Sequence, residues 1–178
     1  MSFPPPALKQ IATEVAELLI RRRETVAIAE TAAGGLMSSA LIAVPGTSSC
    51  FGGGVVAYSL PSRKSFLGWT DGDTVGYDGP TEAIVTKLAT NVRDALAVTY
   101  GIAESGVAGP SRPDRYRSEI RGPGYCALAV VSSGNITTKT IDVSSQALDR
   151  GGNMLAFAEA GLSALLDVLR KAEDASKL

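Results

Sequence analysis

The segment Thr25-Val26-Ala27-Ile28-Ala29-Glu30-Thr31-Ala32-Ala33-Gly34-Gly35-Leu36 joins an apolar run to a helical sequence with almost no loop between them. The apolar run, residues 25–29, predicts a buried strand, because short apolar runs bounded by turn signals are typical of buried sheets. Residues 31–44 are rich in Ala, Leu and Met and predict a helix that Pro45-Gly46 ends. A strand that passes directly into a helix indicates an α/β domain.

Outward from this segment, strands and helices continue to alternate along the chain. Apolar spacing predicts helices at 7–22, 61–67, from Thr81 past Leu96, and 146–170, and strands at 53–58, 102–107, 125–131 and 136–143. Residues 69–80 and 111–123 are predicted to be loops, since they are rich in Asp, Gly, Pro or charge and lack periodicity.

The order α-β-α-β-α-α-β-β-β-α predicts a single α/β domain over residues 1–178, in which a mixed sheet lies between two helical layers, a three-layer α/β/α architecture. Within it, we expect residues 1–6 to form a flexible N-terminus and residues 171–178 to form a polar tail.

The composition excludes several kinds of chemistry. The 178 residues carry a formal charge of −1, which argues against a nucleic-acid partner bound through phosphate neutralisation. The chain has no His and two Cys, so Ser-His-Asp and Cys-His catalysis, imidazole-ligated metals and a Cys₄ zinc site are excluded. No apolar stretch approaches the roughly 20 residues of a membrane span. We therefore expect no membrane partner, no metal and no cofactor, and chemistry based on hydroxyls, lysines, carboxylates and backbone amides.

The chain ends in Ser176-Lys177-Leu178, the tripeptide that the peroxisomal import receptor reads. In a eukaryotic cell this ending predicts a peroxisomal location through that receptor, and otherwise a cytoplasmic one is expected, since two cysteines do not make a disulfide framework. The alternative interpretation is a chance ending on a frayed helix.

Three candidate sites lie where predicted strands end, the edge at which open α/β sheets bind ligands. Thr31 leaves the first strand beside amides that begin a helix and can stabilise an oxyanion or a phosphate. Tyr58 ends the second strand and is followed by Arg63 and Lys64, which can aim a phenol and an amine at one edge. Residues 105–110 pass from a strand into a glycine turn whose amides can form an anion nest.

Each of these patterns also has a purely structural interpretation. Thr31 can be an N-cap whose following glycines only permit close helix packing. Tyr58 can pack in the core while Arg63 and Lys64 lie in water, and residues 105–110 can form an ordinary turn.

Together, the segments resemble the C-terminal domain of the CinA (competence/damage-inducible) family, known as nicotinamide mononucleotide amidohydrolases. The resemblance extends from about residue 8 to residue 170. The matching motifs are residues 29–36, Val44 to Ser48 with the nearby Phe51, Gly53 to Ser59, Leu67-Gly68, Ser105 to Pro110, and Asp149-Arg150.

The resemblance implies hydrolysis of the carboxamide of nicotinamide mononucleotide, or of a related small-molecule amide, to the acid and ammonia. The family's attacking serine falls on Thr31, its tyrosine on Tyr58 and its lysine on Arg63, with Lys64 adjacent. These four positions are the predicted catalytic residues. The predicted ligand-binding residues are Glu30, Ala32, Gly34, Gly35, Ser105, Gly106, Gly109 and Arg150. The resemblance also implies a homo-oligomer.

Several positions depart from the family pattern. The methyl group of Thr31 restricts its χ1 angle, and Arg63 stays protonated and cannot act as a general base. Lys64 points about 100° away on a helix. Ala32-Ala33 replaces Cys-Thr, and residues 111–117 replace a glycine-rich loop.

Three functions therefore stay open: an amidohydrolase with Thr31 as nucleophile, a divergent member whose added arginines at 112, 115 and 117 hold another anion, and a non-catalytic binding protein. For a hydrolase without imidazole, we expect a rate that rises with pH through the alkaline range.

Overall fold

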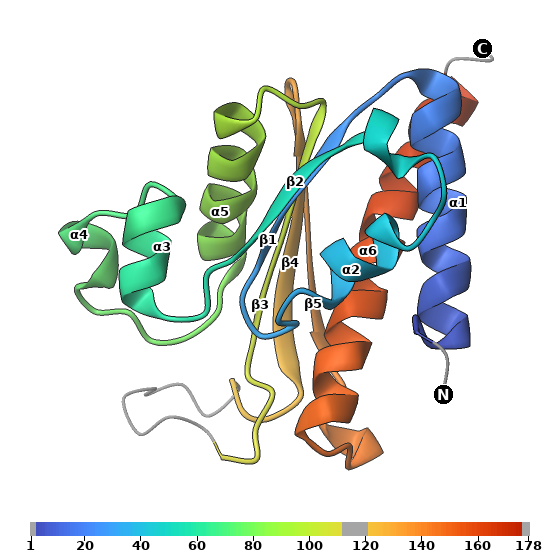
Figure 1. Cartoon of the computed structure of the whole chain (residues 1–178). Helices are drawn as coiled ribbons and strands as arrows, with labels where there is room; N and C mark the ends of the chain where they lie inside the picture. The colour runs from blue at the N-terminus through green and yellow to red at the C-terminus, as the bar shows by residue number, and fades with distance from the viewer. Residues whose placement is uncertain (1–2, 112–120, 176–178) are drawn as a thin grey trace.

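A five-stranded mixed sheet forms the centre of the protein (Figure 1). The computed structural model describes residues 3–111 and 121–175. The strands lie in the order β2-β1-β3-β4-β5, and β1 pairs in parallel with β2 and β3, whereas β3, β4 and β5 pair antiparallel. Their bounds are β1 (Val26–Glu30), β2 (Phe51–Val56), β3 (Tyr100–Gly106), β4 (Tyr125–Ser132) and β5 (Asn135–Asp142).

Helices cover both faces of this sheet, which confirms the predicted three-layer α/β/α architecture (Figure 1). On one face lie α1 (Pro6–Arg22), α2 (Leu36–Ile42) and α6 (Arg150–Ala175), and on the other lies α5 (Glu82–Ala95). Two short helices, α3 (Leu60–Phe66) and α4 (Asp71–Thr74), lie beside α5 at the β2 side of the molecule.

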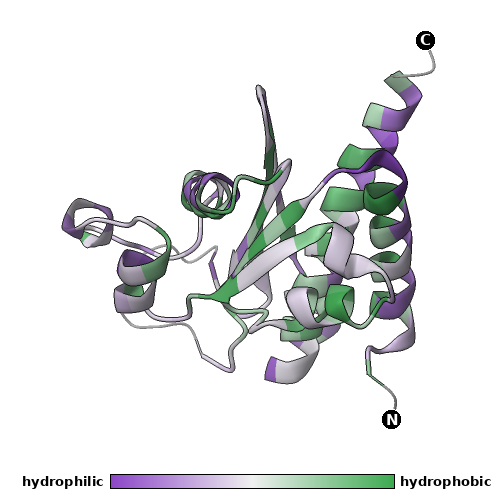
Figure 2. Cartoon of the chain, turned by 45° about the horizontal axis from the view of Figure 1, so that its top comes forward, coloured by the Kyte–Doolittle hydropathy of each residue, from purple (hydrophilic) through white to green (hydrophobic). Residues whose placement is uncertain are grey.

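Alternation along the strands divides the core into two parts. Ile28, Ile102 and Leu128 pack in the larger cluster toward α1, α2 and α6, while the intervening alanines, such as Ala103, pack toward α5. Apolar residues accordingly gather along the strands and on the inward sides of α1 and α6 (Figure 2). Small side chains on the α5 face let that single helix approach the sheet closely.

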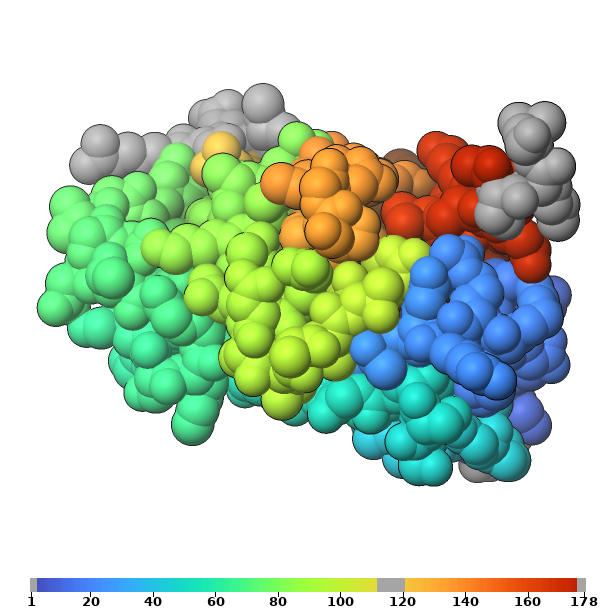
Figure 3. Space-filling model, turned by 90° about the horizontal axis from the view of Figure 1, so that it is seen from above, coloured from blue at the N-terminus to red at the C-terminus, as the bar shows by residue number. Residues whose placement is uncertain are grey.

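The end of the sheet opposite the carboxyl ends of β1 and β3 is covered by three connections. Figure 3 shows the α1–β1 connection, the α5–β3 connection and the β4–β5 turn next to one another at this end. The backbone amide of Tyr100 donates to the carbonyl of Thr25 at 2.9 Å and joins two of them. The other end of the sheet, where β1 and β3 finish, carries the pocket described below.

Several element boundaries differ from the prediction. Helix α2 begins at Leu36 instead of Thr31, and residues 31–35 form a turn. Strand β2 ends at Val56, so Tyr58 lies beyond it. A short helix, α4, forms inside the predicted 69–80 loop, where the side chains of Thr70 and Asp73 cap each other's backbone.

The last helix, α6, begins at Arg150 instead of Gln146 and continues to Ala175, so the predicted polar tail over 171–178 is wrong for residues 171–175. Residues 1–2, 112–120 and 176–178 lie outside the described residues. The arginines at 112, 115 and 117 and the terminal Ser-Lys-Leu are therefore among the positions of which the structure says nothing.

By length and composition α6 is the one described helix that could cross a membrane, but over half of its apolar stretch is buried inside the protein. Among its buried residues are Phe157, Leu162, Leu165 and Leu169, which belong to the core. Its apolar character is therefore that of a core helix.

Close packing of α5 on β3 predicts a large effect of Gly101→Ala on stability. A methyl group at this position would lie 2.0 Å from the carbonyl oxygen of Ala89 and 2.7 Å from the Cβ atom of Arg93, so α5 must move away. We expect a loss of about 3 kcal/mol in the free energy of unfolding, measured by urea denaturation. Gly122→Ala is the control, because a Cβ atom there meets nothing within 4 Å. Equal stability of the two variants would contradict this packing.

Candidate functional site

A pocket of about 540 Å³ opens at the carboxyl ends of β1 and β3. This is the edge at which the sequence placed all three candidate sites, and where ligands bind open α/β sheets. Its lining consists of Thr31, Ala32, residues 58–61, Arg63, Tyr77, residues 106–109, Ser111 and Arg150.

Two fully buried carboxylates, Glu30 and Glu104, lie behind this pocket. Glu30 ends β1, and Glu104 lies two residues before the end of the neighbouring parallel strand β3; each follows an Ile-Ala pair, at residues 28–29 and 102–103. Because Ala29 pairs with Ala103 in register, the two carboxylates follow at matching positions and on the same face of the sheet. Buried charges require hydrogen-bonding partners, and the turn that begins at Thr31 supplies them.

Glu104 holds the start of the turn. Its Oε1 atom accepts hydrogen bonds from the backbone amides of Thr31 at 2.6 Å and Ala33 at 2.7 Å. These short bonds to an ionisable carboxyl group fix the backbone on both sides of Ala32. Strand β3 thereby sets the position of the residue that follows β1.

Glu30 holds the beginning of α2. Its oxygens accept from the amides of Gly35 at 2.9 Å, Met37 at 3.1 Å and Ser38 at 2.9 Å, and from the Ser38 hydroxyl at 2.6 Å. A carboxylate at a helix N-terminus stabilises its free amides. Glu30, a predicted ligand-binding residue, lies outside the pocket lining, because its side chain is buried and bound to α2.

The glycines of the turn also have a structural role. Gly34 and Gly35 have φ angles of +68° and +96°, which other residues rarely adopt. Neither lines the pocket, so their predicted contact with a ligand is not seen. Among the described residues, the amide of Ala32, which does line the pocket, donates no hydrogen bond. It is the amide next to the Thr31 hydroxyl and is free to stabilise an oxyanion.

The Thr31 hydroxyl is held from the next strand. The residue is 2% exposed and lines the pocket, and its Oγ1 atom donates to the Ser105 Oγ atom at 3.2 Å. Ser105 is itself buried and does not line the pocket, contrary to the prediction that it binds a ligand directly. It supports Thr31 from behind instead.

Arg63 is a buried cation in the wall of the pocket, 4% exposed. Its guanidinium group lies 5.1 Å from the ring centre of Trp69 and 5.3 Å from that of Tyr77, within the range of cation–π contacts. It also donates to Tyr77 Oη at 3.1 Å and to Ser105 Oγ at 3.4 Å. Within the described ranges it forms no salt bridge, so aromatic rings and neutral oxygens hold its charge.

The structure separates Lys64 from the site. Its ammonium group pairs with Asp71 on α4, and it does not line the pocket. Of the two predicted cations on α3, Arg63 lines the pocket and Lys64 does not, because one residue along a helix turns a side chain by about 100°.

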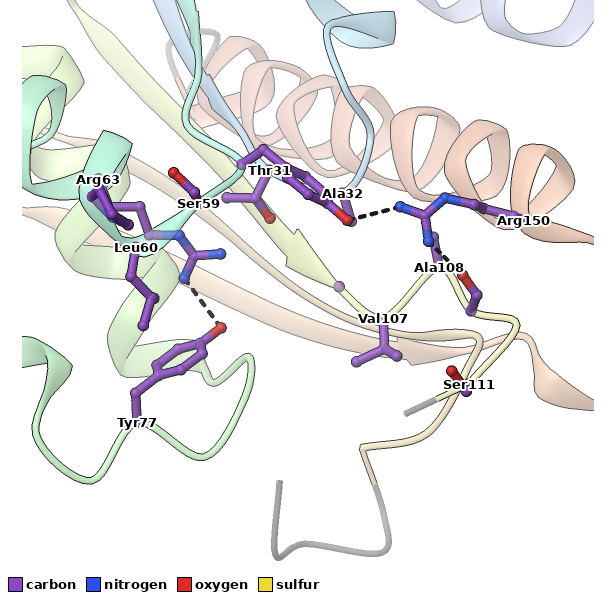
Figure 4. Close-up of a pocket in the computed structure, with 14 residues that line it drawn as sticks. Thr31, Ala32, Ser59, Leu60, Arg63, Tyr77, Val107, Ala108, Ser111 and Arg150 are labelled. Atoms are coloured by element: carbon purple, nitrogen blue, oxygen red, sulfur yellow. Dashed lines mark hydrogen bonds between the residues drawn. The ribbon is translucent and has the colours of Figure 1, made fainter. Parts of the chain in front are cut away.

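Tyr58 and Arg150 meet across the pocket. Tyr58 is 63% exposed, and its Oη atom accepts from Nη2 of Arg150 at 2.9 Å. Arg150 also donates to the carbonyl oxygen of Gly109, which lines the pocket together with Gly106. Figure 4 shows Arg63 and Arg150 on opposite sides of Thr31. The structure thus brings together seven predicted residues, namely Thr31, Ala32, Tyr58, Arg63, Gly106, Gly109 and Arg150.

The sequence reasoning missed Glu104 and Tyr77. The repeated Ile-Ala-Glu at 28–30 and 102–104 is a signal for Glu104, since it places the same acidic residue near the ends of two predicted strands. Tyr77 lies in a predicted loop without a local signal. In the described part of the chain, no group of three or more His, Cys, Asp or Glu residues is arranged to hold a metal.

Burial raises the pKa of Glu104 from 4.5 to about 7, and the negative charge of Glu30 adds to this shift. The amides of Ala33 and Thr31 and the guanidinium of Arg63 act in the opposite direction. Glu104 therefore changes its charge near neutral pH, directly behind Thr31.

This raised pKa predicts how Glu104→Gln changes stability with pH. The folded protein binds the Glu104 proton more tightly than the unfolded chain, so the proton's stabilising effect is complete below pH 4.5 and lost as pH rises to about 7. We expect the variant to gain about 3 kcal/mol relative to the wild type between pH 4.5 and pH 7.5. Urea unfolding across this range measures it, and a constant difference would contradict the shift.

Comparison with known proteins agrees with this architecture. The family model described as the CinA C-terminal domain matches residues 8–169. A CinA-like protein of Fervidobacterium nodosum is 32% identical over 151 residues, 84% of this chain and 36% of the relative. One from Desulforapulum autotrophicum is 34% identical over 152 residues, 85% of this chain and 34% of the relative. The chain thus spans about a third of the length of these relatives.

Solved structures show the same fold. A competence/damage-inducible protein of Agrobacterium tumefaciens superposes with a TM-score of 0.85 at 22% identity, covering 96% of this chain and 99% of its own. A CinA superfamily protein of Klebsiella pneumoniae superposes with a TM-score of 0.83 at 24% identity, covering 92% and 98%. On the family match and the two relatives, this chain belongs to the CinA family, as a C-terminal domain of that family.

Proposed function

We propose that this protein is an amidohydrolase that converts the carboxamide of nicotinamide mononucleotide, or of a related compound, to the acid and ammonia. The observation that carries the proposal is the Thr31 hydroxyl, which lies in the pocket lining at the end of β1, next to the unpaired amide of Ala32. A nucleophile followed directly by an oxyanion-binding amide is the arrangement that acyl transfer requires.

The reaction proceeds in two steps. The Thr31 oxygen attacks the amide carbon, and the carbonyl oxygen gains negative charge that the Ala32 amide stabilises. The hydroxyl proton passes to a base and then to the leaving nitrogen, so the C–N bond breaks and ammonia departs. Water then hydrolyses the ester in the same way, which releases the acid and restores Thr31.

The base in this reaction is the Tyr58 phenolate. Among the described lining residues, only the phenols of Tyr58 and Tyr77 can exchange a proton, since arginine stays protonated. Tyr77 is bound to Arg63, whereas Tyr58 is mostly exposed and is held at the pocket by Arg150.

The charge of the pocket supports a nucleotide as substrate. Arg63 and Arg150 line it, and no carboxylate does so among the described residues. A phosphate group fits such a lining, because guanidinium groups bind phosphate through paired hydrogen bonds.

A second candidate function is binding of the same kind of ligand without turnover. The observation that favours it is the absence of an amine from the described pocket lining: Arg63 stands at the position of the family's lysine, and Lys64 is paired with Asp71. The assay below separates the two functions, since both predict binding and only one predicts ammonia release.

Thr31→Ala should abolish hydrolysis, because no other described hydroxyl at the end of β1 takes the place of the nucleophile. We expect loss of at least about 1,000-fold in kcat/KM for nicotinamide mononucleotide, measured by ammonia release. Thr31→Ser should retain activity. Thr47→Ala, which removes another buried threonine whose hydroxyl bonds the carbonyl of Val44, is the control. Ligand binding by the wild type with no ammonia above the blank would leave the second function standing.

The pH dependence tests the phenolate base. We expect kcat/KM to rise with pH through the alkaline range, because a phenol must lose its proton before it can accept one. Tyr58→Phe should remove this rise, while Tyr100→Phe, which changes a buried tyrosine that bonds Arg22, should keep it. Retention of the alkaline rise in Tyr58→Phe would show that another group is the base.

A further inference from the structure

Strand β3 carries a buried carboxyl group that the proposed reaction does not use. Glu104 is fully buried and lies one residue before Ser105. Its Oε1 atom receives the amides of Thr31 and Ala33, and its Oε2 atom faces the Cys126 thiol at 3.8 Å. The two amides lie on either side of Ala32, a residue that lines the pocket.

We propose that Glu104 is the positioning residue of the reaction: it sets the Thr31 hydroxyl and the Ala32 amide in place through the backbone of residues 31–33, without touching the substrate. This inference rests on the proposed function. Catalysis by a hydroxyl and an oxyanion-binding amide depends on their mutual geometry, since small displacements of reacting groups cost large factors in rate.

Two consecutive residues of β3, Glu104 and Ser105, bind different atoms of Thr31. Side chains at consecutive strand positions point to opposite faces of a sheet. Glu104 accordingly bonds the backbone nitrogen of Thr31 at 2.6 Å, and Ser105 bonds its Oγ1 atom at 3.2 Å. The residue is thereby held at two atoms, so that both the backbone of the turn and the direction of the hydroxyl are set.

Glu30 does not share this role. It contacts the amides of Gly35, Met37 and Ser38 and so holds α2, beyond the reacting groups. Removal of the Glu30 side chain is expected to disturb α2. A change at Glu104 acts directly on the turn that contains Thr31. Glu30 and Glu104 thus follow the same Ile-Ala pair in the sequence, but Glu30 binds the start of α2 and Glu104 binds the turn.

The charges around Glu104 make its hold on the turn depend on pH. The titratable and charged groups that face it are Glu30 on β1, Cys126 on β4 and Arg63 on α3. Ionised, it makes charge-assisted bonds to both amides, and protonated, it makes weaker ones. With its pKa raised to about 7, this change falls in the range in which the enzyme is assayed.

Glu104→Gln tests the inference, because the amide side chain keeps an oxygen for both hydrogen bonds but never ionises. We compare kcat and KM for nicotinamide mononucleotide between pH 5.5 and 9.5 in the wild type, in Glu104→Gln and in Glu159→Gln. Glu159 is the matched control, a half-buried carboxyl of α6 that lies outside the pocket lining and whose pKa is also raised by burial.

The wild type and Glu159→Gln should show a further rise in kcat of about tenfold between pH 6 and pH 8, in addition to the rise that the phenolate base causes over the same range. In Glu104→Gln, kcat should be about tenfold lower at pH 8, its KM should change less than twofold, and the rise near pH 7 should disappear while the alkaline rise stays. A profile of Glu104→Gln that matches the wild type in kcat overturns the inference and leaves the proposed function intact.

Two other experimental outcomes also test whether Glu104 is a positioning residue. If Glu104→Gln does not fold, the wild-type profile is sufficient, because a logarithm of kcat that rises with one constant slope from pH 6 to pH 9, and no more steeply near pH 7, overturns the inference. If the wild type folds and binds the nucleotide but releases no ammonia, the proposed function fails and the inference fails with it.

Discussion

The site depends on two carboxylates buried at neighbouring positions of adjacent parallel strands, near the carboxyl ends of these strands. Removing Glu30 and Glu104 from water is costly, and this cost is offset by five backbone amides that donate to them, three from the turn at residues 31–35 and two from the start of α2. The turn cannot relax without leaving a buried charge unpaired. The rigidity of the turn is therefore a consequence of electrostatics in the core. The turn thereby fixes the positions of the Thr31 hydroxyl and the Ala32 amide.

Local sequence patterns were sufficient for the architecture, because strands and helices that bury a face must carry apolar residues at the right spacing. They failed where a distant residue determines local structure. Residues 31–35 are rich in Ala and Gly and predict a helix start, yet Glu104, from a strand some seventy residues later in the chain, holds them as a turn. The pairing of Lys64 with Asp71 likewise depends on α4, which the composition of residues 69–80 concealed.

The sequence predicted which segments meet at the candidate site, but it did not predict the partners of their side chains. Parallel strands bring Thr31, Tyr58 and the turn at residues 106–109 to one edge, so their meeting follows from topology. The partners that define their roles come from elsewhere. Arg63 is held between Trp69 and Tyr77, which lie in the segment between α3 and α5 and have no spacing that links them to it. A family resemblance identifies the position of Arg63, and only the structure shows that this cation is buried and forms no salt bridge with the described residues.

Threonine at position 31 is consistent with this rigid surrounding. Its β-branch restricts χ1, so the hydroxyl has few directions available, and the bond to Ser105 selects one of them. A serine in the same turn would be freer to rotate and would lose more entropy on reaching the attack geometry. The methyl group crowds the approach of a substrate but reduces that entropic cost. In a turn whose backbone is already held by Glu104 and Glu30, the balance between these two effects decides whether the substituted hydroxyl is a slow nucleophile or a competent one.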